Sequence, residues 1–243
     1  MSFKDIFNID AEVKESAHAR VNLIGEHTDY TGGYVMPTLL SFKNTIEISQ
    51  NNSNEFTVYS QHFKEKKTFN DFKKSINNEW VDYIKGCLHI FFDENKISSR
   101  FINIFISSDI PLERGISSSS ALCVATLKAL NTFFETKIKD PEIAKLAKKV
   151  EFNYIGVSGG IMDQMVSSIG IHGKAFFMNC KNLEYELIDF PENWKFCLID
   201  SEVQRNLRDS SYNERFAQLQ EAEKKLGVEY LGGVKIENFQ TDK

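Results

Sequence analysis

Residues 19–33 read ARVNLIGEHTDYTGG. A short apolar segment, residues 21–25, predicts a strand that ends in a compact polar cluster. Glu26, His27 and Asp29 place two carboxylates and an imidazole within four positions. Such a cluster can bind several hydroxyls of a small polyol, because each buried hydroxyl needs a hydrogen-bond partner. A polar loop that merely follows a strand would look the same, and the spacing matches no zinc-binding motif.

A second polar stretch, PLERGISSSSA at residues 111–121, follows a predicted strand and opens a long predicted helix. Backbone N–H groups at a helix N-terminus bind anions, and a serine hydroxyl there can reach a phosphate or its Mg²⁺. Serines at this place also cap helices. Four in a row exceed what capping needs, so the pattern favours phosphate. The stretch matches neither the Walker loop nor the G-x-S-x-G motif of hydrolases.

Two acidic residues come next along the chain. Glu151 lies twelve residues before Asp163, and the glycine-rich segment GVSGG, residues 156–160, permits close approach of the backbone between them. Asp163 is expected at the start of a short helix. Taken alone, Glu151 is an ordinary surface charge and Asp163 an ordinary acid at a helix N-terminus.

Composition limits the class of protein. The 243 residues are 42% hydrophobic and 26% charged, with a net charge of −5, which predicts a folded chain and disfavours general nucleic-acid binding. There is no apolar run of about 18 residues, and residues 1–10 lack the apolar core of a secretory signal, so no membrane association is predicted. The four scattered cysteines favour buried, reduced thiols, which indicates a cytoplasmic protein.

Strands and helices are mixed without a regular strand–helix alternation, which predicts an α+β fold. The basic runs at residues 64–67 and 73–74 predict solvated surface. Strands are predicted over residues 21–25, 34–37, 42–49, 56–60, 101–107, 174–178, 184–188 and 196–200. Helices are predicted over residues 80–93, 117–134, 141–155 and 212–226.

Taken together, these segments resemble the galactokinase branch of the GHMP small-molecule kinases. RVNLIGEHTDYTGGYVMP resembles the galactokinase signature, GISSSSA resembles the nucleotide-binding motif of the family, and GGIMDQ and SSYNER resemble further segments. The resemblance runs in order from about residue 15 to residue 226. It implies the two-domain GHMP-kinase architecture, with a complete N-terminal domain over residues 1–190 and an incomplete C-terminal domain over residues 191–243.

The resemblance also implies roles for single residues. Asp163 matches the catalytic base and Arg20 the basic residue beside it. Ser119 and Glu151 match a Mg²⁺-coordinating pair. The positions that contact the sugar match Glu26, His27, Thr28, Asp29, Gly160 and Tyr212. The ATP-binding loop matches Glu113, Arg114, Gly115, Ile116, Ser117, Ser118 and Ser119.

The implied reaction uses ATP and Mg²⁺ to convert galactose to galactose 1-phosphate. Two other readings stay open: a galactose-binding or sensing protein without activity, which includes an inactive fragment, and an N-acetylgalactosamine kinase. The serine loop and Asp163 are both present, which argues that the catalytic apparatus is intact. Galactose is therefore the expected partner, with no nucleic acid.

Three departures from the family pattern carry expectations. His18-Ala19 stands where the family reads Pro-Gly, which is expected to displace Arg20 slightly. Glu113-Arg114 stands where the family carries small residues, so Glu113 should repel a triphosphate and weaken nucleotide binding, partly offset by Arg114. The third, glycine-rich motif has no counterpart here. This predicts self-association through an uncovered apolar face, or pairing with a separate C-terminal fragment.

Overall fold

The computed structural model describes residues 1–72, 79–111, 114–202 and 210–235, with the backbone alone at residues 210–212. Its centre is an eight-stranded sheet in which neighbouring strands run in the order β2-β7-β3-β6-β4-β5, with β1 paired to β3 and β8 paired to β7. The strands are β1 (Val13–Asn22), β2 (Tyr34–Val35), β3 (Pro37–Gln50), β4 (Phe56–Ser60), β5 (Glu65–Phe69), β6 (Ile102–Ser108), β7 (Lys174–Asn179) and β8 (Tyr185–Asp189).

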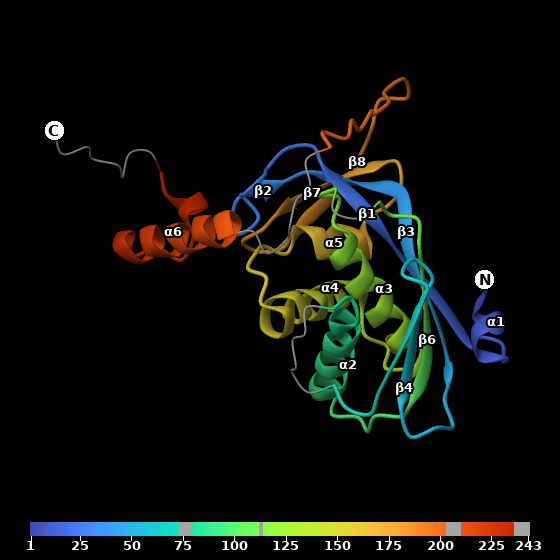
Figure 1. Cartoon of the computed structure of the whole chain (residues 1–243). Coiled ribbons are helices and arrows are strands. Elements are labelled where there is room, and N and C mark those ends of the chain that lie inside the picture. The colour runs from blue at the N-terminus through green and yellow to red at the C-terminus, as the bar shows by residue number, and fades with distance from the viewer. Residues whose placement is uncertain (73–78, 112–113, 203–209, 236–243) are drawn as a thin grey trace.

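Helices pack on one face of this sheet (Figure 1). They are α2 (Val81–Asn95), α3 (Ser118–Phe133), α4 (Asp140–Lys149), the π-helix η1 (Val150–Ile155) and α5 (Met162–Ile169). Outside this layer lie α1 (Phe3–Phe7), α6 (Ser210–Leu226) and the short η2 (Leu231–Gly233). None of the helices in the described part of the chain is long and apolar enough to cross a bilayer.

The long strand β3 organises the sheet. One of its edges pairs with β1, and the other pairs with β6 over Asn44–Gln50 and with β7 at Thr38. The strands β4 and β6 run parallel, whereas the other described pairs are antiparallel. The sheet and the helices are therefore mixed as in an α+β fold, which confirms the predicted class.

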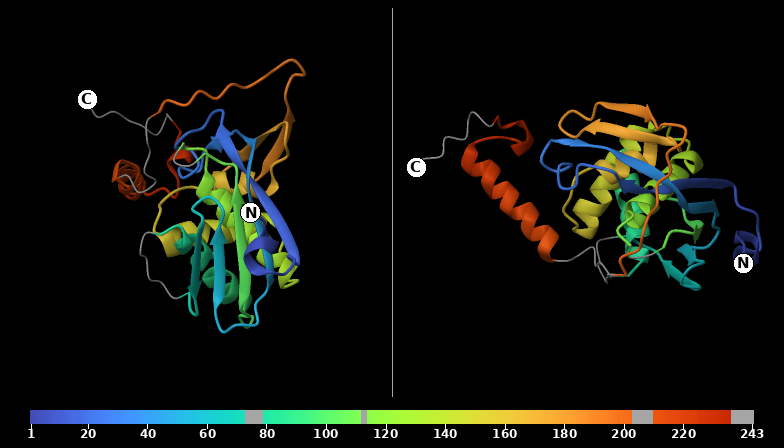
Figure 2. Two further views of the ribbon diagram at one scale, coloured as in Figure 1. Left: turned by 45° about the vertical axis from the view of Figure 1, so that its right-hand side comes forward. Right: turned by 90° about the horizontal axis from the view of Figure 1, so that it is seen from above.

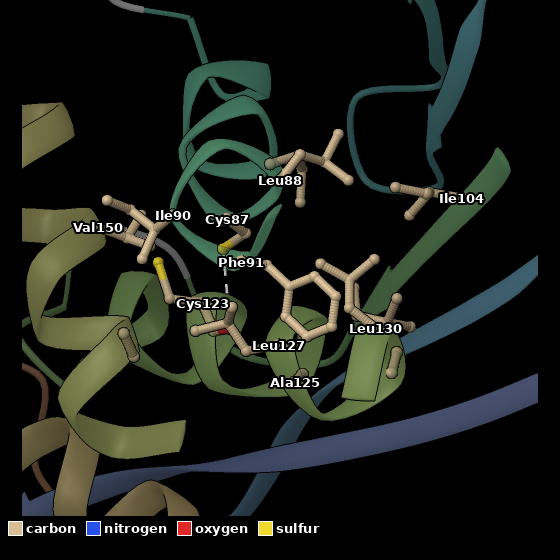
Figure 3. Packing of buried hydrophobic residues seen from close by; sticks show 14 of the residues in the cluster. Cys87, Leu88, Ile90, Phe91, Ile104, Cys123, Ala125, Leu127, Leu130 and Val150 are labelled. Atoms are coloured by element: carbon tan, nitrogen blue, oxygen red, sulfur yellow. Dashed lines mark hydrogen bonds between the residues drawn. The ribbon is translucent and has the colours of Figure 1, made fainter. Parts of the chain in front are cut away.

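The main hydrophobic core fills the space between α2, α3 and the sheet. Phe91 of α2 and Leu127 and Leu130 of α3 are completely buried there (Figure 3). Cys87 approaches the backbone oxygen of Cys123 at 3.8 Å in the same core. Burial of each large apolar side chain stabilises the fold by about 1.5–3 kcal/mol. This core holds α3 rigidly against β1 and β3, and so fixes the position of the N-terminus of α3.

Several local predictions need correction. The strand predicted at residues 196–200 is wrong, because residues 190–202 have no regular secondary structure. The run at residues 64–67 is exposed or half-exposed, in line with the predicted solvated surface, and lies mostly in the edge strand β5, where lysines discourage pairing with another chain; residues 73–74 lie outside the described part of the chain. The strand predicted at residues 21–25 instead spans Val13–Asn22, because pairing with β3 outweighs the polar composition of residues 14–18, and residues 23–25 lie outside it.

The cysteines follow the prediction with one exception. All four are free thiols; Cys87, Cys123 and Cys180 are buried, but Cys197 is exposed. Cys197 was expected in a buried strand, and it lies instead in the irregular segment that follows β8. Apolar neighbours such as Trp194 and Ile199 are exposed as well, at 64% and 87%.

The helix α6 projects away from the sheet and its helical layer (Figures 1 and 2). The helix α6 and the short η2 that follows it both contact the polar loop after β1. The rings of Phe216 and Tyr30 lie 5.5 Å apart. The N–H of Gly232 donates a hydrogen bond of 2.8 Å to the carbonyl of Thr31. Residues far apart in the sequence therefore meet at this loop.

Candidate active site

The carboxylate of Asp163 lies at the start of α5, where an acid also interacts favourably with the helix dipole. Arg20 of β1 donates two hydrogen bonds to it, from Nε to Oδ1 and from Nη2 to Oδ2, both 2.7 Å long. The third nitrogen, Nη1, donates to the carbonyl oxygen of Gly115 at 3.0 Å. Both charged side chains are largely buried, at 14% and 25% exposure, so the pair is shielded from solvent.

Arg20 reaches this position through an irregularity in the sheet. His18 pairs with Lys43 and Arg20 with Leu39, so two steps along β1 correspond to four along β3. The N–H of Arg20 turns to the carbonyl of Ile116 instead. The carbonyl of His18 accepts a hydrogen bond of 2.5 Å from Ser167. These contacts hold the backbone at His18-Ala19, and the two hydrogen bonds direct the Arg20 guanidinium at both oxygens of Asp163.

The serines at the start of α3 direct their hydroxyls at acidic residues. Ser117, at the N-cap position with a φ of 62°, makes no capping bond with its side chain, and its Oγ lies 2.5 Å from Oδ2 of Asp163. Ser119 donates to Oε1 of Glu151 at 2.8 Å, and Ser120 donates to Oε2 at 2.7 Å. Capping therefore does not explain these serines. The first N–H groups of any α-helix have no partner within the helix, and such groups can bind an anion.

The remaining residues of the loop are placed around this turn. Gly115 has a φ of 69°, in the region that favours glycine. Ile116 is buried with Ala19 and Ala121 in a small cluster. The carbonyl of Ser118 accepts a hydrogen bond of 3.0 Å from Asn44. Glu113 lies outside the described residues.

Arg114 has a partner that the sequence did not suggest. Its Nε lies 2.9 Å from Oδ2 of Asp200, and both side chains are partly exposed. The ion pair joins the serine loop to the segment that follows β8, whereas the expected effect of Arg114 on Glu113 stays a prediction, because Glu113 lies outside the described residues. Such a surface pair contributes at most about 1 kcal/mol, so it can exchange for a stronger anion.

Glu151 lies in η1 and is 7% exposed. Burial raises the pKa of this carboxyl, and the nearby Asp163 raises it too, whereas hydrogen bonds from Ser120, Ser119 and Gln164 lower it. π-Helices often occur at functional sites. In this chain the π-helix η1 carries Glu151, whose side chain lies beneath the first turn of α3.

The polar loop after β1 brings Asp29 against Gly160. A Cβ atom added to Gly160 would lie 2.2 Å from Oδ2 of Asp29, so only glycine leaves room for this carboxylate. The pKa of Asp29 is raised to about 7, mainly by burial and also by the Asp163 carboxylate, while Arg20 and Lys148 act in the opposite direction. Asp29 therefore lies against Gly160 and close enough to Asp163 for the two carboxylates to interact.

The other residues of this loop are arranged differently. Glu26 and His27 are exposed, and His27 has a φ of 63° and a hydrogen bond between Nδ1 and the Tyr30 hydroxyl. Thr28, predicted to contact the sugar, uses its hydroxyl inside the turn, where it lies 2.7 Å from the carbonyl of Gly25 and 2.6 Å from that of Tyr34. The side chain of Tyr212 lies outside the described part of the chain.

A cavity of about 410 Å³ lies on the side of Asp29 toward α6. Its wall includes Asp29, Lys148, Cys180, Phe216 and Tyr230. Burial lowers the pKa of Lys148, while Asp29 and Cys180 raise it. The half-buried Lys148 ammonium is thus close enough to Asp29 to lower the pKa of that carboxyl.

Two family models match the parts of the chain that form this site. Residues 1–50 match the galactokinase galactose-binding signature, and residues 82–170 match the GHMP kinases N-terminal domain. The chain contains a GHMP kinase N-terminal domain. Arg20 and Asp29 lie within the first match, and the serine loop, Glu151 and Asp163 lie within the second.

Relatives of the chain include two galactokinases. The one from Thermotoga petrophila is 34% identical over 229 residues, covering 94% of this chain and 64% of the relative. The one from Thermococcus kodakarensis is 36% identical over 212 residues, covering 86% and 59%. The solved structure of Lactococcus lactis galactokinase complexed with galactose superposes with a TM-score of 0.84 at 30% identity, covering 96% of this chain and 63% of that one. The chain therefore spans roughly three fifths of the length of these relatives.

The donor set at Glu151 fits a hard cation. In the described residues, no cluster of three or more His, Cys, Asp or Glu side chains could hold a metal by itself. Mg²⁺ does not require such a cluster, since it is usually bound by one or two protein oxygens together with waters and phosphate oxygens. The Ser119 hydroxyl and the Glu151 carboxylate, 2.8 Å apart, supply two such oxygens.

Three residues of the site were not predicted from the sequence. Gln164 donates to Glu151, Ser120 donates to the same carboxylate, and Lys148 lies near Asp29. Gln164 follows Asp163 directly within GGIMDQ, and Ser120 is the last serine of the run. Lys148 precedes Glu151 by three positions, a helical spacing that places two residues on neighbouring parts of one face. All three residues lie in or near the predicted motifs, but only the fold shows which side chain each of them contacts.

Proposed function

We propose that this chain carries the sugar site and the phosphate-binding helix of a galactokinase, and that it transfers the γ-phosphoryl group of ATP to the anomeric hydroxyl of galactose. The observation that carries the proposal is the convergence of Asp163, clamped by Arg20, with the N-terminus of α3. A phosphoryl-transfer site needs an oriented hydroxyl on one side and neutralisation of phosphate charge on the other. The similarity to a galactokinase complexed with galactose supports the choice of sugar.

Each residue takes a defined task in this proposal. Asp163 accepts the proton of the anomeric hydroxyl and orients its oxygen toward the phosphorus. Arg20 keeps Asp163 in place through two hydrogen bonds and adds positive charge near the transferred group. The Asp29 carboxylate, next to Gly160, binds sugar hydroxyls. The free N–H groups of the first turn of α3 bind phosphate oxygens.

The proposal includes a magnesium site. Ser119 and Glu151 would hold the ion, because they offer two adjacent oxygens beneath the helix N-terminus. When bound, Mg²⁺ neutralises charge on the phosphate oxygens. Ser117 is left to Asp163, since its hydroxyl lies 2.5 Å from that carboxylate.

We also propose a domain boundary near residue 190. Residues 1–190 contain the sheet, its helical layer and the described core clusters. Beyond this point the chain loses regular structure up to residue 202, and α6 stands away from the layers. We assign residues 1–190 to the N-terminal domain and residues 191–243 to the beginning of a second domain.

The decisive experiment measures galactose-dependent release of ADP from Mg-ATP by the purified chain, together with galactose binding by calorimetry. Asp163→Asn should lower turnover by about 10²–10⁴-fold, the usual contribution of a general base, while galactose binding stays detectable. Asp140→Asn is a matched control, because Asp140 pairs with Lys128 near the surface. Full turnover in Asp163→Asn would remove the assignment of the base. Galactose binding without turnover would favour a non-catalytic galactose-binding protein.

A further inference from the structure

Glu151 receives more hydrogen bonds than the proposed pair with Ser119 requires. Its Oε1 accepts from Ser119 at 2.8 Å. Its Oε2 accepts from Ser120 at 2.7 Å and from Nε2 of Gln164 at 2.5 Å. The four residues are buried, with exposures of 7% for Glu151, 9% for Ser119, 3% for Ser120 and 6% for Gln164.

We propose that Gln164 and Ser120 are positioning residues, which hold Oε2 of Glu151 so that Oε1 and the Ser119 hydroxyl stay directed at a divalent cation bound with the nucleotide. This inference rests on the proposed function, because it assigns a task to residues around the site named there. Neither Gln164 nor Ser120 touches the reacting atoms. Each acts through Glu151.

Geometry explains why two donors are needed. A carboxylate held at one point can still rotate about its side-chain bonds, whereas two donors from different elements restrict that rotation. Gln164 comes from α5 and Ser120 from α3, and Glu151 itself comes from η1. An ionised carboxylate only accepts hydrogen bonds, so all three donors favour one charged, oriented form of Glu151. Oε1 has a single described donor, the Ser119 hydroxyl, so in this proposal it is the oxygen that the cation shares with Ser119.

The other end of the Gln164 side chain points to the same role. Its Oε1 is buried and has no hydrogen-bond partner within the described residues. A buried acceptor without a partner destabilises a fold, so this amide is a poor choice if packing alone decides the residue. An apolar side chain of similar length would fill the same space without that penalty. The amide is therefore explained by the hydrogen bond that it donates to Glu151.

The position of Gln164 also connects the two carboxylates of the site. It follows Asp163 directly, and both lie in the first turn of α5. The serines at the start of α3 likewise bind both carboxylates: Ser117 donates a hydrogen bond to Asp163, and Ser120 donates one to Glu151. Two helix N-termini therefore hold the proposed base and the proposed cation ligand in one rigid unit.

The test uses Mn²⁺ as the probe cation, because its free concentration is measured directly by electron paramagnetic resonance. The whole chain is titrated with Mn²⁺ in the presence of ADP, and galactose affinity and melting temperature are measured on the same samples. Gln164→Met and Ser120→Ala should each weaken Mn²⁺ binding by about 10–100-fold, the range found when residues that orient metal ligands are removed. Galactose affinity should change less than about twofold, since Asp29 and Asp163 keep their own partners.

Ser168→Ala is the matched control for Ser120→Ala. Ser168 is likewise a buried serine that donates one hydrogen bond of 2.7 Å, in this case to the carbonyl of Asp140. It should lose a similar amount of stability and bind Mn²⁺ normally. Gln164→Met should melt within a few degrees of the unchanged chain, because it also removes the unpartnered acceptor.

Several outcomes overturn the inference. Normal Mn²⁺ affinity in both Gln164→Met and Ser120→Ala would do so, as would an equal loss in Ser168→Ala. A parallel loss of Mn²⁺ binding, galactose binding and melting temperature would reveal a purely structural role. Failure of the unchanged chain to bind Mn²⁺ with ADP would also overturn it, whereas galactose binding by that chain would leave the proposed sugar site standing.

Discussion

Arg20 and Asp163, 143 positions apart in the chain, are joined by two parallel hydrogen bonds of 2.7 Å. Arg20 lies at an irregular point in β1, and Asp163 lies in the first turn of α5. A planar guanidinium matches a carboxylate at both oxygens, which fixes direction as well as distance. This pair orients the proposed base, and the following predictions start from it.

Arg20→Lys should lower kcat by about 10–100-fold, because an ammonium keeps the charge but cannot make both hydrogen bonds with the guanidinium geometry. Galactose affinity should fall less than kcat. Steady-state kinetics and calorimetry measure the two effects. Arg100→Lys is the control for the same chemical change, since Arg100 lies over the rings of Phe133 and Phe134, 5.6 and 5.1 Å from their centroids. Equal kcat in both variants would refute the role of the bidentate pair.

Galactose binding should depend on pH through Asp29. Burial raises the pKa of this carboxyl to about 7. A protonated carboxyl is a weaker acceptor for sugar hydroxyls than a carboxylate. We therefore expect galactose affinity to rise between about pH 6 and pH 8 and then to level off. Calorimetric titrations across this range, with Asp29→Asn as the reference without a titration, test the assignment.

Lys148 should set the midpoint of that pH dependence. Its positive charge lowers the pKa of Asp29, so Lys148→Met should move the midpoint to higher pH. Lys149→Met is a close control, because the neighbouring Lys149 pairs with Glu94 at 2.8 Å. An identical midpoint in the two variants would show that Lys148 does not act on Asp29.

Asp29 should also make the fold less stable at high pH. Its pKa in the folded protein lies above the ordinary value of 3.8, so folding favours the protonated form. The stability that this proton contributes is lost as the pH rises toward and through about 7. Asp29→Asn should therefore melt higher than the unchanged chain at pH 8, with a smaller difference at pH 5. Calorimetric melts at both values decide the point, and a lower melting temperature at pH 8 would contradict it.

Gly160→Ala should damage the sugar site. Its added Cβ would lie 2.2 Å from Oδ2 of Asp29, so the carboxylate or the backbone has to move. Overpacking of this kind costs about 1–3 kcal/mol, which corresponds to roughly a 5- to 150-fold loss of galactose affinity if the whole cost falls on the bound state. Gly233→Ala is the matched control, since a Cβ there meets nothing within 4 Å. If both variants bind galactose equally well, Gly160 is not needed to make room for Asp29.

Asp200→Asn should strengthen nucleotide binding modestly. Arg114 pairs with Asp200 at 2.9 Å, and loss of that charge frees the guanidinium for a phosphate. Because a partly exposed ion pair is worth at most about 1 kcal/mol, ADP should bind no more than about fivefold tighter. Asp189→Asn, which removes an equivalent surface partner of Lys174, should leave ADP affinity unchanged. Weaker ADP binding in Asp200→Asn would show that the pair supports the loop.

Many elements could be predicted from local pattern. Residues 56–60 and α3 were found almost where the sequence placed them, because their apolar content and spacing repeat within a few residues. The edge strand β5 and the start of β1 were missed, since charged residues there are held by pairing with neighbouring strands. The predicted strand at residues 196–200 had suitable composition but is paired with no strand in the described residues.

The sequence alone determined the α+β class, the family and most candidate residues, including Arg20, Asp29, Glu151 and Asp163, because motifs and residue types are local properties. Only the tertiary structure decided the partners of those residues. Ser117 faces Asp163, Ser120 and Gln164 face Glu151, and Arg114 faces Asp200. Hydrogen bonds and pKa shifts depend on distance and burial among segments that the fold brings together, and neither quantity is written in the order of residues.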